Sequence, residues 1–224
     1  MTTLPHPDEG SSPGPDRATA ATPEQRAQRL AELGLALAPS GALDALATEL
    51  AAAADTPYSM INWISDGQYF AGLHTPDGRS DLPAVGREMS LDHGYCPELL
   101  HRTKPLVLPD VCSSSRFSGN PVVDMIGIRS YTGAPLVDPV TGIVFGTICA
   151  VGTEPRPGHT GQHSLHLIKT FRDRLWGILH AAPRPPLPAP HHHTSPQPRP
   201  RPLPLAHGTA PALPAAPDTQ ERDR

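Results

Sequence analysis

The sequence lacks the features that would assign it to several common classes. Its formal net charge is only −4, without the basic patch typical of nucleic-acid-binding proteins, so we expect no nucleic-acid partner. No apolar run approaches the roughly 18 residues of a membrane span, so we expect no membrane association. The N-terminus has no basic start followed by an apolar stretch, which argues against a secretion signal. Three widely spaced cysteines make no disulfide framework and favour a reducing, cytoplasmic location.

Proline is abundant, but it is concentrated at the two ends of the chain. Most of the 30 prolines lie within residues 1–23 and 183–224. Such segments bury too little apolar area to offset the entropy of ordering them. We therefore predict a disordered leader over 1–21, one domain over 22–182, and a disordered proline-rich tail over 183–224.

Two helices are predicted at the start of this domain and one at its end. Thr22, followed three residues later by Gln25, forms a capping-box pattern for a helix that ends near Leu33. Apolar residues at helical spacing after Ser40 predict a second helix with one buried face. A third helix is expected from about Thr160 to Ala181.

Between these helices the sequence predicts two β-hairpins and a short helix. The runs YSMINWIS and QYFAGL form the first hairpin, and IRSYTGAPLVD and GIVFGTICAV form the second. In the last run, Phe145 and Cys149 are predicted on one face, with Val144, Ile148 and Ala150 on the other. Both faces are apolar, which predicts an α+β fold with a mostly antiparallel sheet between two further layers. The run LDHGYCPELLHR is expected to form the short helix, capped by Asp92.

A series of motifs resembles the GAF domain family over roughly residues 30–180. These motifs are SLDHGYC, KPLVLPDV, RFSGNPVV and the stretch from GIRSYTGAPLV to GTEPRP. The resemblance implies a three-layer α/β/α domain with a pocket between the sheet and the region from Ser90 to Pro121. It also implies a homodimer formed through the terminal helices. Because no effector domain is recognised beside the domain, output is expected through a signalling partner such as a histidine kinase or a phosphatase.

The resemblance also indicates which side chains would bind a ligand. Aromatic walls with a few polar groups are typical of small-molecule pockets. The residues expected to bind a ligand are Tyr95, Cys96, Asp110, Phe117, Asn120, Arg129 and Tyr131. The motifs identify no particular ligand or cofactor, and we interpret the chain as a non-catalytic sensor or regulatory module.

Metal binding and thiol chemistry are the alternatives for the segment around Cys96. On a helix, His93 and Cys96 would share one face, whereas His101 would lie roughly 140° away from Cys96. One helix would then supply two ligands at most, and no CxxC pair supplies the others, so we predict no metal site. A thiol oxidoreductase of the free methionine sulfoxide reductase type would use Cys96 and Cys112, with His93 as base. Cys149 is interpreted as a small apolar core residue.

Overall fold

The computed structural model describes residues 17–77 and 80–181. These residues all fall within the unit of the chain that spans residues 1–187. Most of the predicted leader and all of the predicted tail beyond residue 182 lie outside the described residues. None of the described helices is long and apolar enough to cross a membrane.

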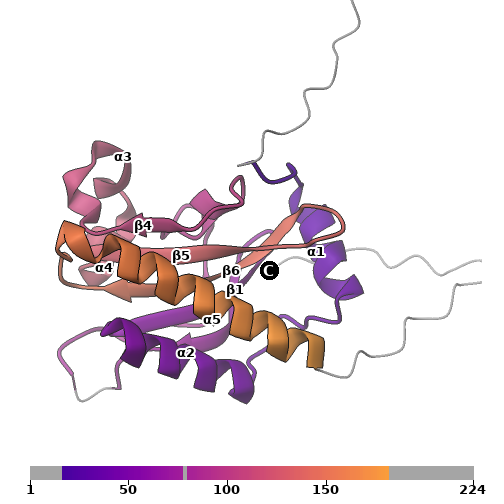
Figure 1. The fold of residues 1–224 in the computed structure, drawn as a ribbon, viewed down its shortest axis with the longest axis horizontal. Helices are drawn as coiled ribbons and strands as arrows, with labels where there is room; N and C mark the ends of the chain where they lie inside the picture. The colour runs from indigo at the N-terminus through magenta and orange to yellow at the C-terminus, as the bar shows by residue number, and fades with distance from the viewer. Residues whose placement is uncertain (1–16, 78–79, 182–224) are drawn as a thin grey trace, which may run out of the picture. The chain divides into compact units, whose positions relative to one another are not determined.

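A six-stranded antiparallel sheet forms the centre of the domain (Figure 1). The strand order is β3-β2-β1-β6-β5-β4. The strands are β1 (Tyr58–Ile64), β2 (Gln68–His74), β3 (Glu88–Met89), β4 (Leu106–Leu108), β5 (Ser130–Val137) and β6 (Val144–Gly152). The two predicted hairpins are β1–β2 and β5–β6, and β1 and β6 pair with each other at the centre. The predicted α+β class with an antiparallel sheet is confirmed.

A β-bulge in β6 changes which face one large side chain occupies. Leu136 pairs with Gly146, but Val137 pairs with Val144, so Phe145 is an extra residue on β6. Such a bulge breaks the alternation of side chains along a strand. Phe145 therefore packs with Ile148 on the helical side of the sheet. The prediction that Phe145 shares a face with Cys149 was wrong.

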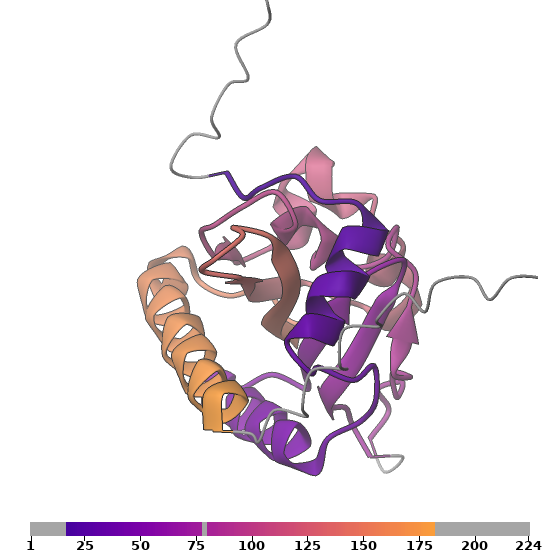
Figure 2. The same cartoon turned by 90° about the vertical axis from the view of Figure 1, so that its right-hand side faces the viewer.

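Three helices cover this side of the sheet: α1 (Pro23–Glu32), α2 (Gly41–Ala54) and α5 (Gly161–Ala181). The predicted capping box of α1 is present, with Thr22 and Gln25 bonding each other's backbone amides. Helices α2 and α5 lie side by side (Figure 2). Apolar residues of all three helices join the large side chains Trp63 and Phe145 in one core.

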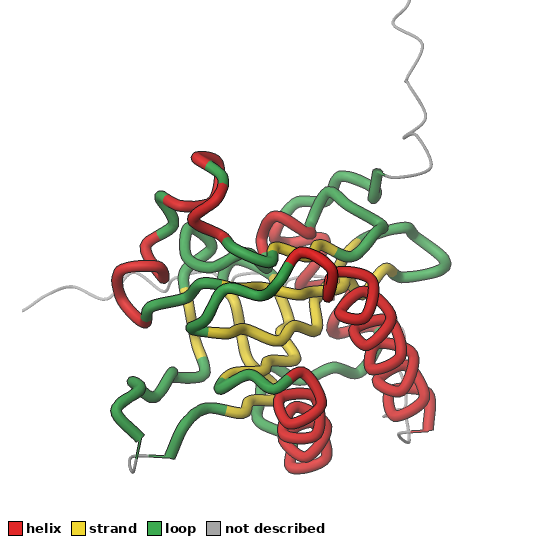
Figure 3. The backbone as a smooth tube through the Cα atoms, turned by 60° about the vertical axis from the view of Figure 1, so that its left-hand side comes forward, coloured by secondary structure: helices red, strands yellow, loops and turns green. Residues whose placement is uncertain are grey.

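The opposite side of the sheet is covered by loops and short helical turns, as Figure 3 shows. These turns are η1 (Pro97–Leu99), η2 (Val111–Ser113), α3 (Ser115–Ser118) and α4 (Pro121–Ile126). The predicted helix starting at Asp92 is absent from this described segment, because Gly94 adopts a φ of 76° that ends helical geometry. Asp92 instead accepts a bond from the ring of the neighbouring His93.

Residues 17–21, which were predicted to belong to the leader, pack against the domain. Ala18 is buried, and its neighbours Arg17 and Thr19 form backbone bridges to Arg102 and Ile143. The Arg26 guanidinium donates to the carbonyl oxygens of Ala21 and Ser65. Residues 17–21 therefore contact the domain from the N-terminal side of the predicted boundary at residue 22.

Candidate functional site

Three of the residues predicted to bind a ligand meet in one buried cluster beneath the loop-covered side of the sheet. Tyr95 and Cys96 lie on the segment before η1, and Tyr131 lies on β5. The rings of Tyr95 and Tyr131 are 5.4 Å apart, and the Tyr131 hydroxyl donates to the Cys96 sulfur at 3.4 Å. Burial raises the pKa of Tyr95 to about 12, and burial also raises the pKa of Tyr131 well above its ordinary value. Both phenols therefore stay protonated and act as hydrogen-bond donors.

Cys149 of β6 joins this cluster, with its sulfur 3.5 Å from the sulfur of Cys96. The hydrogen bond with Cys149 is the largest cause that lowers the pKa of the Cys96 thiol, and the Tyr131 hydroxyl adds to it, although burial opposes this. The pKa of Cys149 is raised, because its hydrogen bond with Cys96 and its burial both favour the protonated thiol. The interpretation of Cys149 as an apolar core residue missed this contact. Thr147 and Cys149 are two residues apart on β6, so the sequence already placed both side chains on the same face of the sheet.

A buried amide network lies beside the thiols. The Asn62 side chain donates to the Gln68 side chain at 3.0 Å, and Gln68 donates to the carbonyl oxygens of Ser90 and His93. The hydroxyl of Thr147 is buried without a hydrogen bond. The Gln68 side chain therefore holds the backbone before Cys96 onto the sheet. Sequence analysis did not identify any of them, because their proximity depends on strand pairing.

A small cavity and a surface groove adjoin this cluster. The cavity, about 30 Å³ in volume, is lined by Cys96, Cys149 and Tyr131, among others. This volume is enough for a water molecule but far below the roughly 300 Å³ of a small-molecule pocket. The groove, about 320 Å³, runs over the outer surface. Cavity and groove share the side chains of Met89, Val122 and Ile126 as a common wall.

Phe117 and Asn120 support this site from outside the cavity. Phe117 packs edge-on against the Tyr95 ring at 5.9 Å, and its carbonyl accepts the Tyr95 hydroxyl. Asn120 caps α4 through the amide of Val122 and bonds both backbone groups of Gly94. Both residues therefore position the segment that carries Tyr95 and Cys96.

Asp110 and Arg129 form a separate pair. Their side chains are bonded to each other at the surface, and Arg129 lowers the pKa of the Asp110 carboxyl. Asp110 also caps η2 by accepting from the amide of Cys112. Neither side chain lines the small cavity or the groove.

The residues of the thiol-enzyme alternative are not assembled as predicted. Cys112 is exposed, whereas Cys96 is buried against Cys149. His93 bonds the exposed carboxylate of Asp92. Within residues 17–77 and 80–181, no three His, Cys, Asp or Glu side chains gather as metal ligands.

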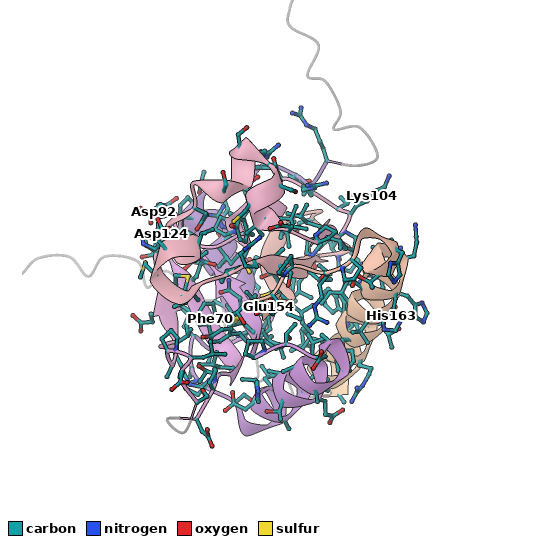
Figure 4. All side chains as sticks on the ribbon, turned by 90° about the vertical axis from the view of Figure 1, so that its left-hand side faces the viewer. Phe70, Asp92, Lys104, Asp124, Glu154 and His163 are labelled. Carbon is teal, nitrogen blue, oxygen red and sulfur yellow. The ribbon has the colours of Figure 1, made fainter. Side chains whose placement is uncertain are left out.

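A second cavity of about 190 Å³ lies on the helical side, between α2, α5 and the strands β4 and β5. Its polar lining includes Arg156 and His163. The Arg156 guanidinium is already bonded to carbonyl oxygens at the C-terminal end of α2. Figure 4 shows His163 on the opposite side of the domain from Asp92 and Asp124. The two cavities have only Tyr131 in common among their lining residues.

Comparison with known proteins identifies the family of the domain. The sequence model of the GAF domain matches residues 39–179. No curated protein sequence matches the chain. Similar solved structures include the GAF domain from an Acinetobacter phosphoenolpyruvate-protein phosphotransferase, with 14% identity and a TM-score of 0.48. That alignment covers 72% of this chain and 95% of that one.

Two further structures illustrate the range of these similarities. The phycocyanobilin-bound GAF domain from a cyanobacterial phytochrome is 16% identical, with a TM-score of 0.47 and coverage of 72% and 97%. The free methionine-R-sulfoxide reductase from Neisseria meningitidis, in complex with its substrate, is 15% identical, with a TM-score of 0.44 and coverage of 74% and 97%. Similarity at this level does not indicate a ligand or a reaction for this chain.

Proposed function

The chain belongs to the GAF domain family, and from this premise we propose that it is a non-catalytic sensor module for a small molecule. The observation that carries the proposal is the wall shared by the cavity and the groove. Met89, Val122 and Ile126 separate a buried cavity from an open surface groove. Rotation of these side chains would join the two spaces into one pocket that reaches Cys96 and Tyr131.

The lining of the groove favours a neutral, largely apolar ligand. Apart from Glu88 and His93, its side chains are apolar or small, and Met125 presents an exposed apolar surface. No arginine or lysine lines the groove or the cavity. An anionic ligand such as a nucleotide would therefore lose its hydration without gaining a cationic partner. Gln68, Cys96 and Tyr131 would supply a few polar contacts.

A neutral apolar dye, Nile red, tests this proposal on the full chain. We expect its fluorescence to rise on binding and to fall again in the variant Met125→Ala, which removes apolar surface from the groove. Val140→Ala is the matched control, because Val140 is an exposed apolar residue in the β5–β6 turn, which does not line the groove. Equal binding by both variants and the unchanged chain would refute the groove as the site. Tighter binding of cyclic nucleotides than of neutral ligands would refute the proposed ligand class.

The thiol oxidoreductase alternative has less support. Its two cysteines, Cys96 and Cys112, differ in burial, and Cys96 contacts Cys149 instead. A direct assay with free methionine sulfoxide and a dithiol reductant tests it. Turnover that is lost in Cys112→Ser would favour the enzyme over the sensor.

Output through a signalling protein and assembly as a homodimer are further parts of the proposal. Both are supported by the family, whose members occur in signalling proteins, and we place the dimer contact on the terminal helices α1 and α5. A cytoplasmic location is supported by three free cysteines in the described part of the chain. Light scattering coupled to size-exclusion chromatography tests the dimer, and a monomer at micromolar concentration would contradict it.

A further inference from the structure

The two buried thiols are arranged for a reaction with each other. Their sulfur atoms are 3.5 Å apart, and the residues are 53 positions apart in the chain. Cys96 is 5% exposed and Cys149 is 1% exposed. A disulfide needs the sulfurs at about 2.05 Å, so they would move together by roughly 1.5 Å. Cys96 lies on a loop segment without regular secondary structure, which makes such a shift less costly than within the sheet.

The surroundings make the two thiols chemically unequal. The Tyr131 hydroxyl donates to the Cys96 sulfur, whereas the buried Thr147 hydroxyl nearby has no hydrogen-bond partner. The Tyr131 bond favours the thiolate of Cys96, whose pKa is lowered mainly through its bond with Cys149. Cys149, with its raised pKa, retains its proton. Cys96 is therefore the more readily ionised of the two thiols and faces a thiol that keeps its proton, an arrangement suited to a two-step oxidation.

A small oxidant has a place to react. The cavity of about 30 Å³ is lined by both thiols. It has room for a molecule of about the size of water. Met89, Val122 and Ile126 line both this cavity and the surface groove. Larger oxidants, such as bulky organic hydroperoxides, do not fit this space.

We propose that Cys96 and Cys149 form a site of reversible oxidation by hydrogen peroxide. The Cys96 thiolate attacks one peroxide oxygen and the O–O bond breaks, which gives a sulfenic acid and a hydroxide that takes up a proton to become water. The sulfur of Cys149 then attacks the Cys96 sulfur, its proton leaves with the hydroxyl group as a second water, and the disulfide forms. Two thiols are oxidised and one peroxide is reduced, and a dithiol reductant reverses the reaction. The site does not depend on the binding of any other ligand.

Peptide mapping of the full chain tests this site directly. Trypsin places the three cysteines on three peptides, residues 88–102, 103–116 and 130–169, because Lys104 and Arg156 precede proline and resist cleavage. After treatment with hydrogen peroxide and alkylation of free thiols, we expect peptides 88–102 and 130–169 to be joined, with a mass lower by about 2 Da than the sum of the two. Dithiothreitol should restore the separate peptides. The variant Cys112→Ser should give the same joined pair.

The unfolded chain provides the matched control. In guanidinium chloride the closer pair, Cys96 and Cys112, should form a loop roughly sixfold more often than Cys96 and Cys149, because closure entropy grows with loop length. Exclusive joining of Cys96 to Cys149 in the folded chain would therefore show that the native contact directs the reaction. This comparison requires no substitution of a buried residue. Tyr131→Phe should slow the oxidation without changing the pairing. The proposal is overturned if peroxide leaves both core thiols reduced, or if Cys112 is the cysteine that becomes joined.

Discussion

Asn120 holds the segment that carries Cys96, and its replacement by alanine has a calculable cost. Its side-chain oxygen accepts from the amides of Val122 and Gly94, and its side-chain nitrogen donates to the carbonyl of Gly94. Loss of the helix cap costs about 1 kcal/mol. The two bonds to Gly94 contribute about 1 kcal/mol each. The free energy of unfolding should therefore fall by about 3 kcal/mol.

Urea unfolding followed by tryptophan fluorescence measures this loss, because both Trp63 and Trp176 are in or against the core. A loss of about 3 kcal/mol corresponds to a fall in Tm of roughly 6–12 °C for a domain of this size. Asn120→Asp keeps the acceptor but removes the donor, so it should cost less than half as much as alanine. Ser115→Ala, an exposed change on the neighbouring α3, should stay within about 0.5 kcal/mol of the unchanged chain.

The size of the stability loss in Asn120→Ala also separates the roles of Asn120. A loss of only about 1 kcal/mol in Asn120→Ala would mean that the residue caps α4 and nothing more. A loss equal to that of Ser115→Ala would refute the whole argument. Where the loss is as expected, alkylation of Cys96 by iodoacetamide should be faster in Asn120→Ala, because the covering segment is less firmly held.

Two further predictions concern the helical side of the domain. The Asp138 carboxylate is buried and pairs with the Arg29 guanidinium at 2.8 Å. Burial raises the pKa of this carboxyl, but the hydrogen bonds from Arg29 and Thr141 outweigh burial, so the net effect is a lowered pKa. Asp138→Asn should therefore cost about 3 kcal/mol at neutral pH, and the difference should shrink as the pH falls below about 4, measured by urea unfolding at each pH. A difference that stayed constant with pH would contradict the ion pair. Gly72→Ala would set a Cβ only 2.6 Å from the backbone oxygen of Leu43 and should lower stability by about 1–3 kcal/mol. The control Gly177→Ala, in open space on α5, should raise it by about 0.5–1 kcal/mol, and equal effects in thermal unfolding would refute the close approach.

Local sequence signals predicted most of the fold, because they depend on neighbours in the chain. The capping box at Thr22, the apolar stripe of the helix after Ser40 and the alternating runs of both hairpins all act over a few residues. The expected helix at Asp92 was wrong, since one glycine with a positive φ ended a favourable helical pattern. The face of Phe145 was wrong because a bulge depends on how the partner strand is aligned.

The sequence by itself determined the α+β class and the family, and it predicted Tyr95, Cys96 and Tyr131 as site residues. Motifs and periodicity depend only on the order of residues along the chain, so they can be recognised without coordinates. Only the tertiary structure brought Cys149 to Cys96 and left Cys112 outside. Strand pairing and chain crossing set distances between residues far apart in sequence, and no local pattern encodes them. Asp110 and Arg129 were expected to line the cavity, but they bond each other and do not line it. The reason is the same, because their position depends on contacts between distant parts of the chain.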